Sequence, residues 1–207
     1  MTRLVLATRN PHKVEELTAM LGGLPVEVLS FIDFPDMPEV VEDGVTLEEN
    51  AVKKAVEVAE FTGLPSLADD TGLEVEALAG APGVLSARYS GEGANAERNN
   101  AKLLSELSGF RGRDRAAAFR CVVALAVPHG AAGDTSVEPA VVVGETRGVI
   151  LEAPRGEGGF GYDPLFLPDG HGRTYAEMNS GEKNAVSHRG KAIKLARGLV
   201  EALPGAF

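Results

Sequence analysis

The segment Ser66–Gly72 (SLADDTG) places two adjacent carboxylates, Asp69 and Asp70, directly after an apolar pair and before a hydroxyl and a glycine. This order predicts that the chain leaves a strand there with charge at its end. Paired carboxylates at such a corner suit Mg²⁺ and phosphate chemistry, because Mg²⁺ prefers oxygen ligands. The same residues also fit a plain Asx turn, in which an aspartate accepts backbone N–H bonds. This segment alone leaves both interpretations open.

A second polar group lies near the N-terminus. The apolar run Leu4–Ala7 is followed by TRNPHK at residues 8–13, after which apolar residues recur at helical spacing. Asn10 is a suitable N-cap and Pro11 suits the first helical position. Free N–H groups at a helix start, with Lys13 in the first turn, can hold phosphate oxygens. The alternative is an ordinary capped helix with a solvated lysine, and the missing glycines exclude a Walker loop.

A third group follows the run Gly156–Gly161 (GEGGFG), which formally satisfies the GxGxxG fingerprint. A dinucleotide site needs a helix to begin there, and the proline-flanked extended sequence that follows predicts none. We therefore reject a Rossmann site. The loop instead delivers Phe160, Tyr162 and Asp163 together, which could stack a planar base and bind its edge, or form an aromatic core plug beside a turn aspartate.

A fourth group opens the last predicted helix. Ser187 is a natural N-cap, which places His188 and Arg189 in the first turn. Cations at that end oppose the helix dipole. This arrangement favours a ligand contact for both residues.

The remaining sequence predicts the elements that must position these groups. Thr46 begins a capping box (TLEE) and an amphipathic helix, preceded by an exposed acidic and proline-rich connection over residues 33–44. A further helix is expected over residues 95–107, and the last helix should stop at Pro204. Strands are expected at residues 26–30, 116–127 and 141–151, the last two forming a hairpin whose tip is the loop at residues 129–138.

Composition limits the class of protein. A chain of 207 residues, 44% hydrophobic, is long enough for one core and short enough for one domain, residues 1–207. A net charge of −10 argues against a nucleic-acid-binding surface. The single cysteine, Cys121, excludes a disulfide framework and fits a reducing cytoplasm. No apolar run is long enough for a membrane span, so we expect a protein that binds neither nucleic acid nor membrane.

Five segments, taken in order, resemble the Ham1/RdgB family of noncanonical purine nucleoside triphosphate pyrophosphatases. They are TRNPHK from Thr8, LADDTGLEVEAL from Leu67, GAPGVLSARYSG from Gly80, GGFGYDPLF from Gly158 and SHRGKA from Ser187. The match runs from the first predicted strand to the last helix. One departure is Arg9, where a glycine is common in the family.

The resemblance implies a mixed α/β fold of the ITPase-like kind. Such a fold has an elongated sheet with helices on its faces and two lobes around a central nucleotide cleft, and it is usually a homodimer. Members of the family cleave ITP, dITP and XTP between the α and β phosphates with Mg²⁺, giving the monophosphate and pyrophosphate and cleansing the nucleotide pool. The resemblance thus implies a purine nucleoside triphosphate as substrate.

The resemblance also implies residue roles. Asp70 matches the proton acceptor and a metal-linked position, with Asp69 and Glu42 beside it in an acidic cluster. The triphosphate loop corresponds to Thr8, Arg9, Asn10, Pro11, His12 and Lys13. A further phosphate-binding lysine corresponds to Lys54. The nucleotide-contacting positions correspond to Thr71, Phe160, Gly161, Tyr162, Asp163, Lys183, His188 and Arg189.

Two other functions remain open at this point. A pyrophosphatase of the same chemistry could prefer a different base, such as a modified pyrimidine, and a panel of triphosphates would separate the two. A nucleotide sensor would bind without hydrolysis. The presence of Glu42, Asp69 and Asp70 counts against the sensor, because binding alone does not need an acidic cluster.

Overall fold

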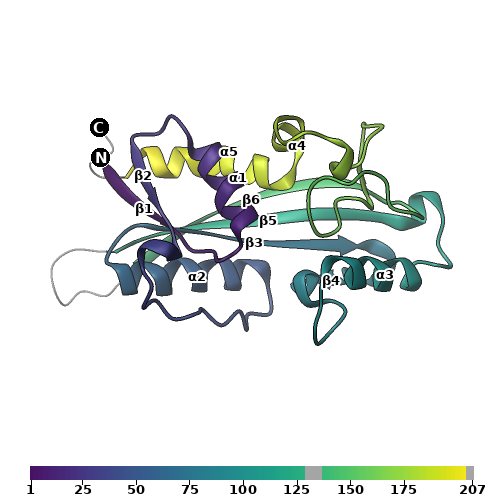
Figure 1. The fold of residues 1–207 in the computed structure, drawn as a ribbon, viewed down its shortest axis with the longest axis horizontal. Helices are drawn as coiled ribbons and strands as arrows, with labels where there is room; N and C mark the ends of the chain where they lie inside the picture. The colour runs from purple at the N-terminus through teal and green to yellow at the C-terminus, as the bar shows by residue number, and fades with distance from the viewer. Residues whose placement is uncertain (129–136, 204–207) are drawn as a thin grey trace. The chain divides into compact units, whose positions relative to one another are not determined.

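The structure, a computed structural model, describes residues 1–128 and 137–203. The predicted loop at residues 129–138 falls mostly outside this range, as does the predicted stop at Pro204. The chain forms a mixed α/β fold around a seven-stranded sheet of order β2-β1-β3-β5-β6-β7, with β4 paired to β3 (Figure 1). The strands are β1 (Thr2–Leu6), β2 (Val26–Leu29), β3 (Ser66–Val75), β4 (Pro82–Gly83), β5 (Ala116–Pro128), β6 (Val137–Ile150) and β7 (Phe166–Pro168). The helices are α1 (Pro11–Leu21), α2 (Leu47–Thr62), α3 (Ala96–Glu106), α4 (Ser180–Val186) and α5 (His188–Glu201).

The sheet is mixed in direction. β1 is parallel to both β2 and β3, with Leu6 opposite Leu67, whereas β4 and β7 are antiparallel to β3 and β6. Because β1 ends at Leu6 beside Leu67, the loop at residues 8–13 begins where β3 approaches Asp69. The parallel register therefore places the loop after β1 beside the two aspartates of β3.

The helices begin where the sequence predicts. The Asn10 side chain accepts bonds from the backbone N–H groups of His12 and Lys13, and Pro11 occupies the first position of α1. Thr46 caps α2 through the N–H of Glu49. The Glu49 carboxylate accepts the N–H of Val45 at 2.7 Å, one residue before the cap, so only the Thr46 half of the predicted capping box forms as expected.

The chain forms two compact units. Unit 1 comprises Met1–Asp70, Val122–Val143 and Ala192–Phe207, and unit 2 comprises Thr71–Cys121 and Gly144–Lys191. Strands β3, β5 and β6 and helix α5 contribute residues to both. It stays a prediction that the chain forms one domain and that a nucleotide cleft lies between two lobes.

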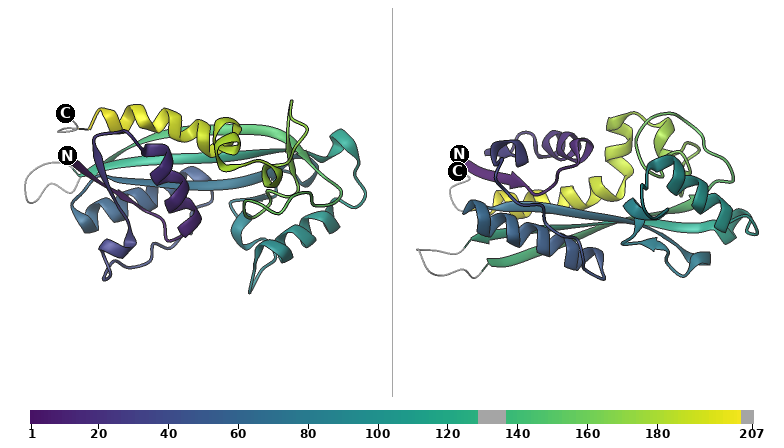
Figure 2. Two further views of the ribbon diagram at one scale, coloured as in Figure 1. Left: turned by 45° about the horizontal axis from the view of Figure 1, so that its top comes forward. Right: turned by 60° about the horizontal axis from the view of Figure 1, so that its bottom comes forward.

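In unit 1, α1 and the later part of α5 lie on one face of β1 and β3, and α2 lies on the other (Figures 1 and 2). Each helix presents small or branched apolar residues that are completely buried, such as Leu17 of α1, Ala55 of α2 and Ala196 of α5. Sheet faces covered on both sides explain why β1 reads as a continuous apolar run rather than an alternating one.

In unit 2, the core is rich in aromatic residues. Phe119, Tyr162, Phe166 and Tyr175 are packed in one buried cluster together with Leu103 and other aliphatic side chains. Helix α4 was not predicted as a separate element. Gly190 allows the first turn of α5 to lie against α4, because a Cβ there would collide with the Asn184 carbonyl. Among the described residues, no helix is long and apolar enough to cross a membrane.

Candidate functional site

The loop after β1 presents donors at the start of α1. The hydroxyl of Thr8 accepts the Asn10 N–H at 3.3 Å, and Asn10 in turn caps the helix. His12 is exposed and Lys13 is half-buried in the first turn. This end of the 11-residue helix has the positive dipole, the N–H groups and the ammonium that suit an anion.

The Arg9 side chain does not join that group. Its guanidinium lies 4.3 Å from the Phe31 ring centroid and donates to the Met37 carbonyl at 2.7 Å. Arg9, which stands where the family commonly has glycine, thus packs its side chain against the segment that follows β2. A substrate role for the Arg9 side chain stays a prediction. It is the backbone of Arg9, not its side chain, that adjoins Asn10.

The Asp69 side chain is completely buried and faces the phosphate loop. Its Oδ2 lies 3.0 Å from the Lys13 ammonium, which also donates to the Asp69 carbonyl at 3.4 Å. The loop lysine is therefore held in place by the strand on which the two aspartates lie.

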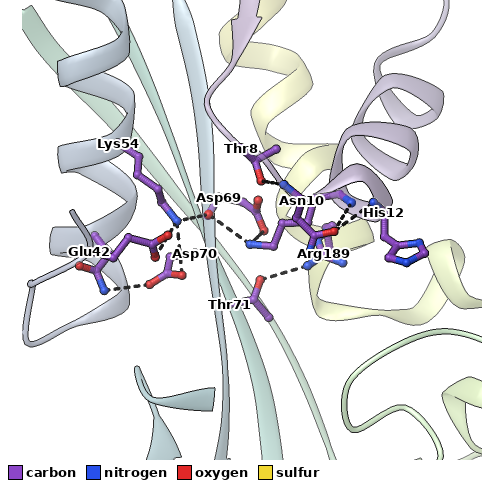
Figure 3. Close-up of polar contacts among 11 residues, drawn as sticks. Thr8, Asn10, His12, Glu42, Lys54, Asp69, Asp70, Thr71 and Arg189 are labelled. Atoms are coloured by element: carbon purple, nitrogen blue, oxygen red, sulfur yellow. Dashed lines mark hydrogen bonds and ion pairs between the residues drawn. The ribbon is translucent and has the colours of Figure 1, made fainter. Parts of the chain in front are cut away.

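Asp70 faces the other way, toward α2 (Figure 3). Its Oδ2 accepts the Asn50 side-chain amide at 3.2 Å, and its Oδ1 lies 3.5 Å from the Lys54 ammonium. Lys54 also contacts Glu42 Oε2 at 3.1 Å and the Asp69 carbonyl at 2.8 Å. Two carboxylates, Glu42 and Asp70, thus share one buried ammonium.

One expectation about this segment is wrong. The predicted corner at Asp69 and Asp70 does not exist, because β3 continues through both residues to Val75. Consecutive strand residues point to opposite faces, so Asp69 goes to Lys13 while Asp70 goes to Lys54. Metal binding by Asp70, Glu42 and Asp69 stays a prediction, and across the described residues no three His, Cys, Asp or Glu side chains are grouped to hold a metal.

The charges around Asp70 shift its pKa and that of Lys54. Burial raises the pKa of the Asp70 carboxyl, only partly opposed by the charges of Lys54 and Lys13. Burial lowers the pKa of Lys54, but the carboxylates of Asp70, Asp69 and Glu42 outweigh it and leave that pKa raised. Lys54 therefore stays an ammonium, and Asp70 is an unusually basic carboxylate.

The raised Asp70 pKa gives a prediction for stability. Because the folded state binds this proton more tightly than the unfolded state, acid favours folding at this residue. Relative to Asp70→Asn, the free energy of unfolding of the wild type should rise as the pH falls through the raised pKa, and level off below the ordinary value of 3.8. Urea unfolding of both proteins in a metal chelator, at stepped pH, measures this difference. A wild type that loses stability relative to Asp70→Asn as the pH falls would contradict the raised pKa.

A divalent cation fits the pair formed by Glu42 and Asp70. Mg²⁺ is commonly held by one or two carboxylates together with substrate phosphates rather than by a full set of protein ligands. Glu42 comes from the acidic connection and its side chain is 39% exposed, whereas that of Asp70 is 11% exposed, so the pair is open on one side. Asp69 is not brought together with this pair.

In unit 2, a buried ion pair organises the glycine loop. Lys183 of α4 lies 2.7 Å from Asp163 Oδ2, which also accepts the Phe160 N–H at 2.8 Å. The Lys183 ammonium lies 4.6 Å from the Phe160 ring centroid. Gly159 has φ 71°, and a Cβ there would collide with the Asp163 carboxylate, so glycine is required for this approach. The loop is therefore shaped around Asp163.

The start of α5 adds a histidine and an arginine to unit 2. Ser187 caps the helix through the Gly190 N–H at 3.1 Å, as predicted, and His188 and Arg189 follow, each 3% exposed. Arg189 lies 5.4 Å from the Phe160 ring centroid and donates to the Thr71 hydroxyl at 3.4 Å (Figure 3). Lys183, Arg189 and Phe160 are thus brought together, as a planar ligand would require.

The side chains of His188 and Tyr162 are packed differently from that group. The His188 ring stacks on Phe119 with centroids 4.5 Å apart, and Tyr162 is buried in the core, where its hydroxyl donates to the Ser86 carbonyl at 2.8 Å. The Gly161 carbonyl accepts the Asn100 amide at 3.0 Å. Any substrate role of Tyr162 and Gly161 would therefore use their backbone. The turns that follow Gly161 contain no helix, which confirms the rejection of a Rossmann site.

Sequence reasoning missed two residues that shape these groups. Asn50 binds Asp70, and its spacing of four from Lys54 places both on one face of α2, which is a signal that the sequence contains. Phe119 stacks on His188 from a strand far away in sequence, and no local pattern indicates that contact.

Comparison with known proteins gives a consistent result. The model of the Ham1 family matches residues 4–198. A dITP/XTP pyrophosphatase of Geobacter sulfurreducens is 59% identical over 94% of both chains, and one of Desulforamulus reducens is 50% identical over 97% of this chain and 96% of its own. Among solved structures, a HAM1 protein from Coxiella burnetii gives a TM-score of 0.86 at 40% identity, covering 98% of this chain and all of its own. This chain belongs to the Ham1 family.

Proposed function

We propose that this protein hydrolyses noncanonical purine nucleoside triphosphates, namely dITP, XTP and ITP, to the monophosphate and pyrophosphate. The observation that carries the proposal is the arrangement around Asp70: a buried, basic carboxylate between an amide and an ammonium, on the strand that also holds the phosphate-loop lysine. The relatives named above support the same substrates. The role in cleansing the nucleotide pool follows from that activity.

The residues of unit 1 would bind the phosphates and activate water. The Asp70 carboxylate, oriented by the Asn50 amide at Oδ2, would accept a proton from water as the water oxygen bonds to the α-phosphorus. The bond from that phosphorus to the bridging oxygen breaks, and pyrophosphate leaves with the electron pair. Lys13, Lys54 and the N–H groups of α1 offset its charge. Mg²⁺, held by Glu42 and Asp70, would supply charge neutralisation at the phosphoryl oxygens.

The residues of unit 2 would bind the base. Phe160 offers a face for stacking, and Lys183 and Arg189 offer donors beside it. Hypoxanthine and xanthine carry a carbonyl acceptor at C6, where adenine carries an amino donor. Donors from Arg189 therefore favour the first two bases and leave adenine with two donors facing each other.

Arg189→Ala should reduce kcat/KM for ITP and dITP by about 10- to 100-fold, because a buried unpaired polar group costs about 1–3 kcal/mol. The melting temperature should change far less than that of a core variant, since the contacts of Arg189 described above are with a hydroxyl and a ring. Steady-state kinetics and thermal unfolding of the same preparation measure both. An unchanged kcat/KM for ITP would contradict the role of Arg189.

The homodimer and the cytoplasmic location also remain proposals. The family resemblance supports the dimer, and light scattering of the purified protein would test it. Cys121, the single cysteine of the chain, is buried, and this sparing use of cysteine supports a reducing compartment.

The deciding experiment incubates the protein with Mg²⁺ and a panel of triphosphates. We expect pyrophosphate and monophosphate from dITP, XTP and ITP, with little from ATP or the pyrimidine nucleotides. Release of phosphate and a diphosphate would overturn the proposed bond cleavage. Preference for a modified pyrimidine would overturn the base assignment while leaving the chemistry intact, and binding without turnover would indicate a sensor.

A further inference from the structure

Helix α2 holds the connection that carries Glu42 at four successive residues. Lys54 contacts Glu42 at 3.1 Å and Lys53 contacts Asp43 at 2.6 Å. Asn50 accepts the Gly44 N–H at 2.8 Å, as Glu49 does that of Val45. Each side chain of the helix thus fixes one residue of an otherwise irregular segment.

Among these four, Asn50 is the one that also reaches Asp70 through a hydrogen bond and carries no charge. It is 1% exposed, so its amide has no access to bulk water. Its Oδ1 accepts the Gly44 N–H, and this bond determines which end of the amide faces Asp70. The other end must then be Nδ2, which donates to Asp70 Oδ2 at 3.2 Å. A backbone N–H therefore sets the direction of the bond to the carboxylate.

Gly44 is adapted to the same contact. A Cβ at this position would lie 2.6 Å from Asn50 Oδ1 and 2.9 Å from Glu49 Cβ. The backbone can approach Asn50 only because residue 44 has no side chain. Two residues with no acid or base chemistry of their own, Gly44 and Asn50, thus connect the segment bearing Glu42 to the strand bearing Asp70.

We propose that Asn50, locked by Gly44, is a positioning residue that fixes the orientation of the Asp70 carboxylate, with Oδ2 on Asn50 and Oδ1 on the side of Lys54, and keeps Glu42 in register with it. This inference rests on the proposed function, because it assigns Asp70 to catalysis. Asn50 contacts Asp70 and not the base or phosphate groups described above. Its loss should therefore reduce kcat and leave KM for the nucleotide unchanged.

The test uses Asn50→Asp, which keeps the size of the side chain and the acceptor for Gly44. It replaces the donor with a carboxylate facing Asp70 Oδ2. We expect kcat for dITP to fall about 10- to 100-fold, the range found when groups that orient a functional ligand are removed. Hydrogen exchange of the peptide covering residues 39–46 should stay as slow as in the wild type. Asn50→Ala should lose both the rate and the protection.

Asn99→Asp is the matched control. Asn99 of α3 is 5% exposed, accepts the Ser90 N–H at 2.8 Å and donates to the Ala87 carbonyl at 3.1 Å, so it makes the same kind of bridge with no carboxylate partner among those contacts. It should lose stability and retain kcat. Gly44→Ala approaches the contact from the other side and should lower kcat without touching Asp70.

The outcomes separate the two proposals. A wild type that releases no pyrophosphate from any triphosphate would defeat the proposed function itself. An active wild type with full kcat in folded Asn50→Ala, which has no donor for Asp70, would overturn the positioning role alone. An equal loss of kcat in Asn99→Asp would also overturn it, because the effect would then follow from general destabilisation. Loss of kcat confined to the Asn50 and Gly44 variants would establish it.

Discussion

Asp70→Asn should lower kcat for pyrophosphate release from dITP by about 10²- to 10⁴-fold, the contribution typical of a positioned general base. The side chain of the introduced asparagine keeps an oxygen that can accept a hydrogen bond from the Asn50 amide, so the local packing is retained. No carboxylate remains, however, to take a proton from water. Initial rates with Mg²⁺ in excess measure the loss.

The same substitution should not destabilise the metal-free protein at neutral pH. It removes a carboxyl group whose pKa is raised by burial. Removing a buried charge of this kind often leaves the free energy of unfolding unchanged or increases it. Lys54 keeps its contacts with Glu42 and with the Asp69 carbonyl. Urea unfolding in a chelator tests this expectation.

Asp169→Asn provides the control for Asp70→Asn. Asp169 is exposed and is paired with Arg113 at 2.7 Å. Its replacement should leave both kcat and stability near the wild type, since exposed pairs contribute about 0–1 kcal/mol. If Asp70→Asn retained wild-type turnover, the catalytic assignment of Asp70 would be wrong.

Lys183→Met should lower the free energy of unfolding by about 3–5 kcal/mol, the usual cost of leaving one buried charge without its partner. Methionine approximates the length of the lysine, so the loss reports the charge rather than a cavity. The side chains of Lys183 and Asp163 are 7% and 5% exposed, which leaves the aspartate little access to water once the ammonium is gone. Urea unfolding at neutral pH measures the change.

A double variant, Lys183→Met with Asp163→Asn, distinguishes the charge from the packing. The asparagine introduced by the second substitution carries no charge and can still accept the Phe160 N–H, so most of the lost stability should return. Base binding should not return, because the donor beside Phe160 is still absent. A single variant as stable as the wild type would show that the pair contributes nothing to the fold.

The sequence predicted the local parts of the site well. Asn10 caps α1, Ser187 caps α5 and Thr46 caps α2 because each cap depends on residues within three positions of it. The family could also be inferred from the sequence, because the presence and order of five motifs along a chain do not depend on how the chain folds. The glycine loop was correctly excluded as a dinucleotide site for the same local reason.

The sequence was least decisive where a local pattern had two solutions. Thr71 and Gly72 are compatible with a turn, but pairing with neighbouring strands keeps β3 extended through Asp69 and Asp70. For Tyr162 the sequence left base stacking and core packing open, and the structure buries its side chain in the core of unit 2. Propensity decides neither case, because long-range pairing and packing contribute more than local preference.

The sequence by itself therefore determined which chemical groups this protein possesses: two adjacent aspartates, a capped loop with Lys13, and cations at the start of the last helix. Only the tertiary structure decided which of them act together. It directs Asp69 to Lys13 and Asp70 to Lys54, and supplies Asn50 from α2. The physical reason is that the side a strand residue faces, and what covers that side, depend on elements distant in the chain.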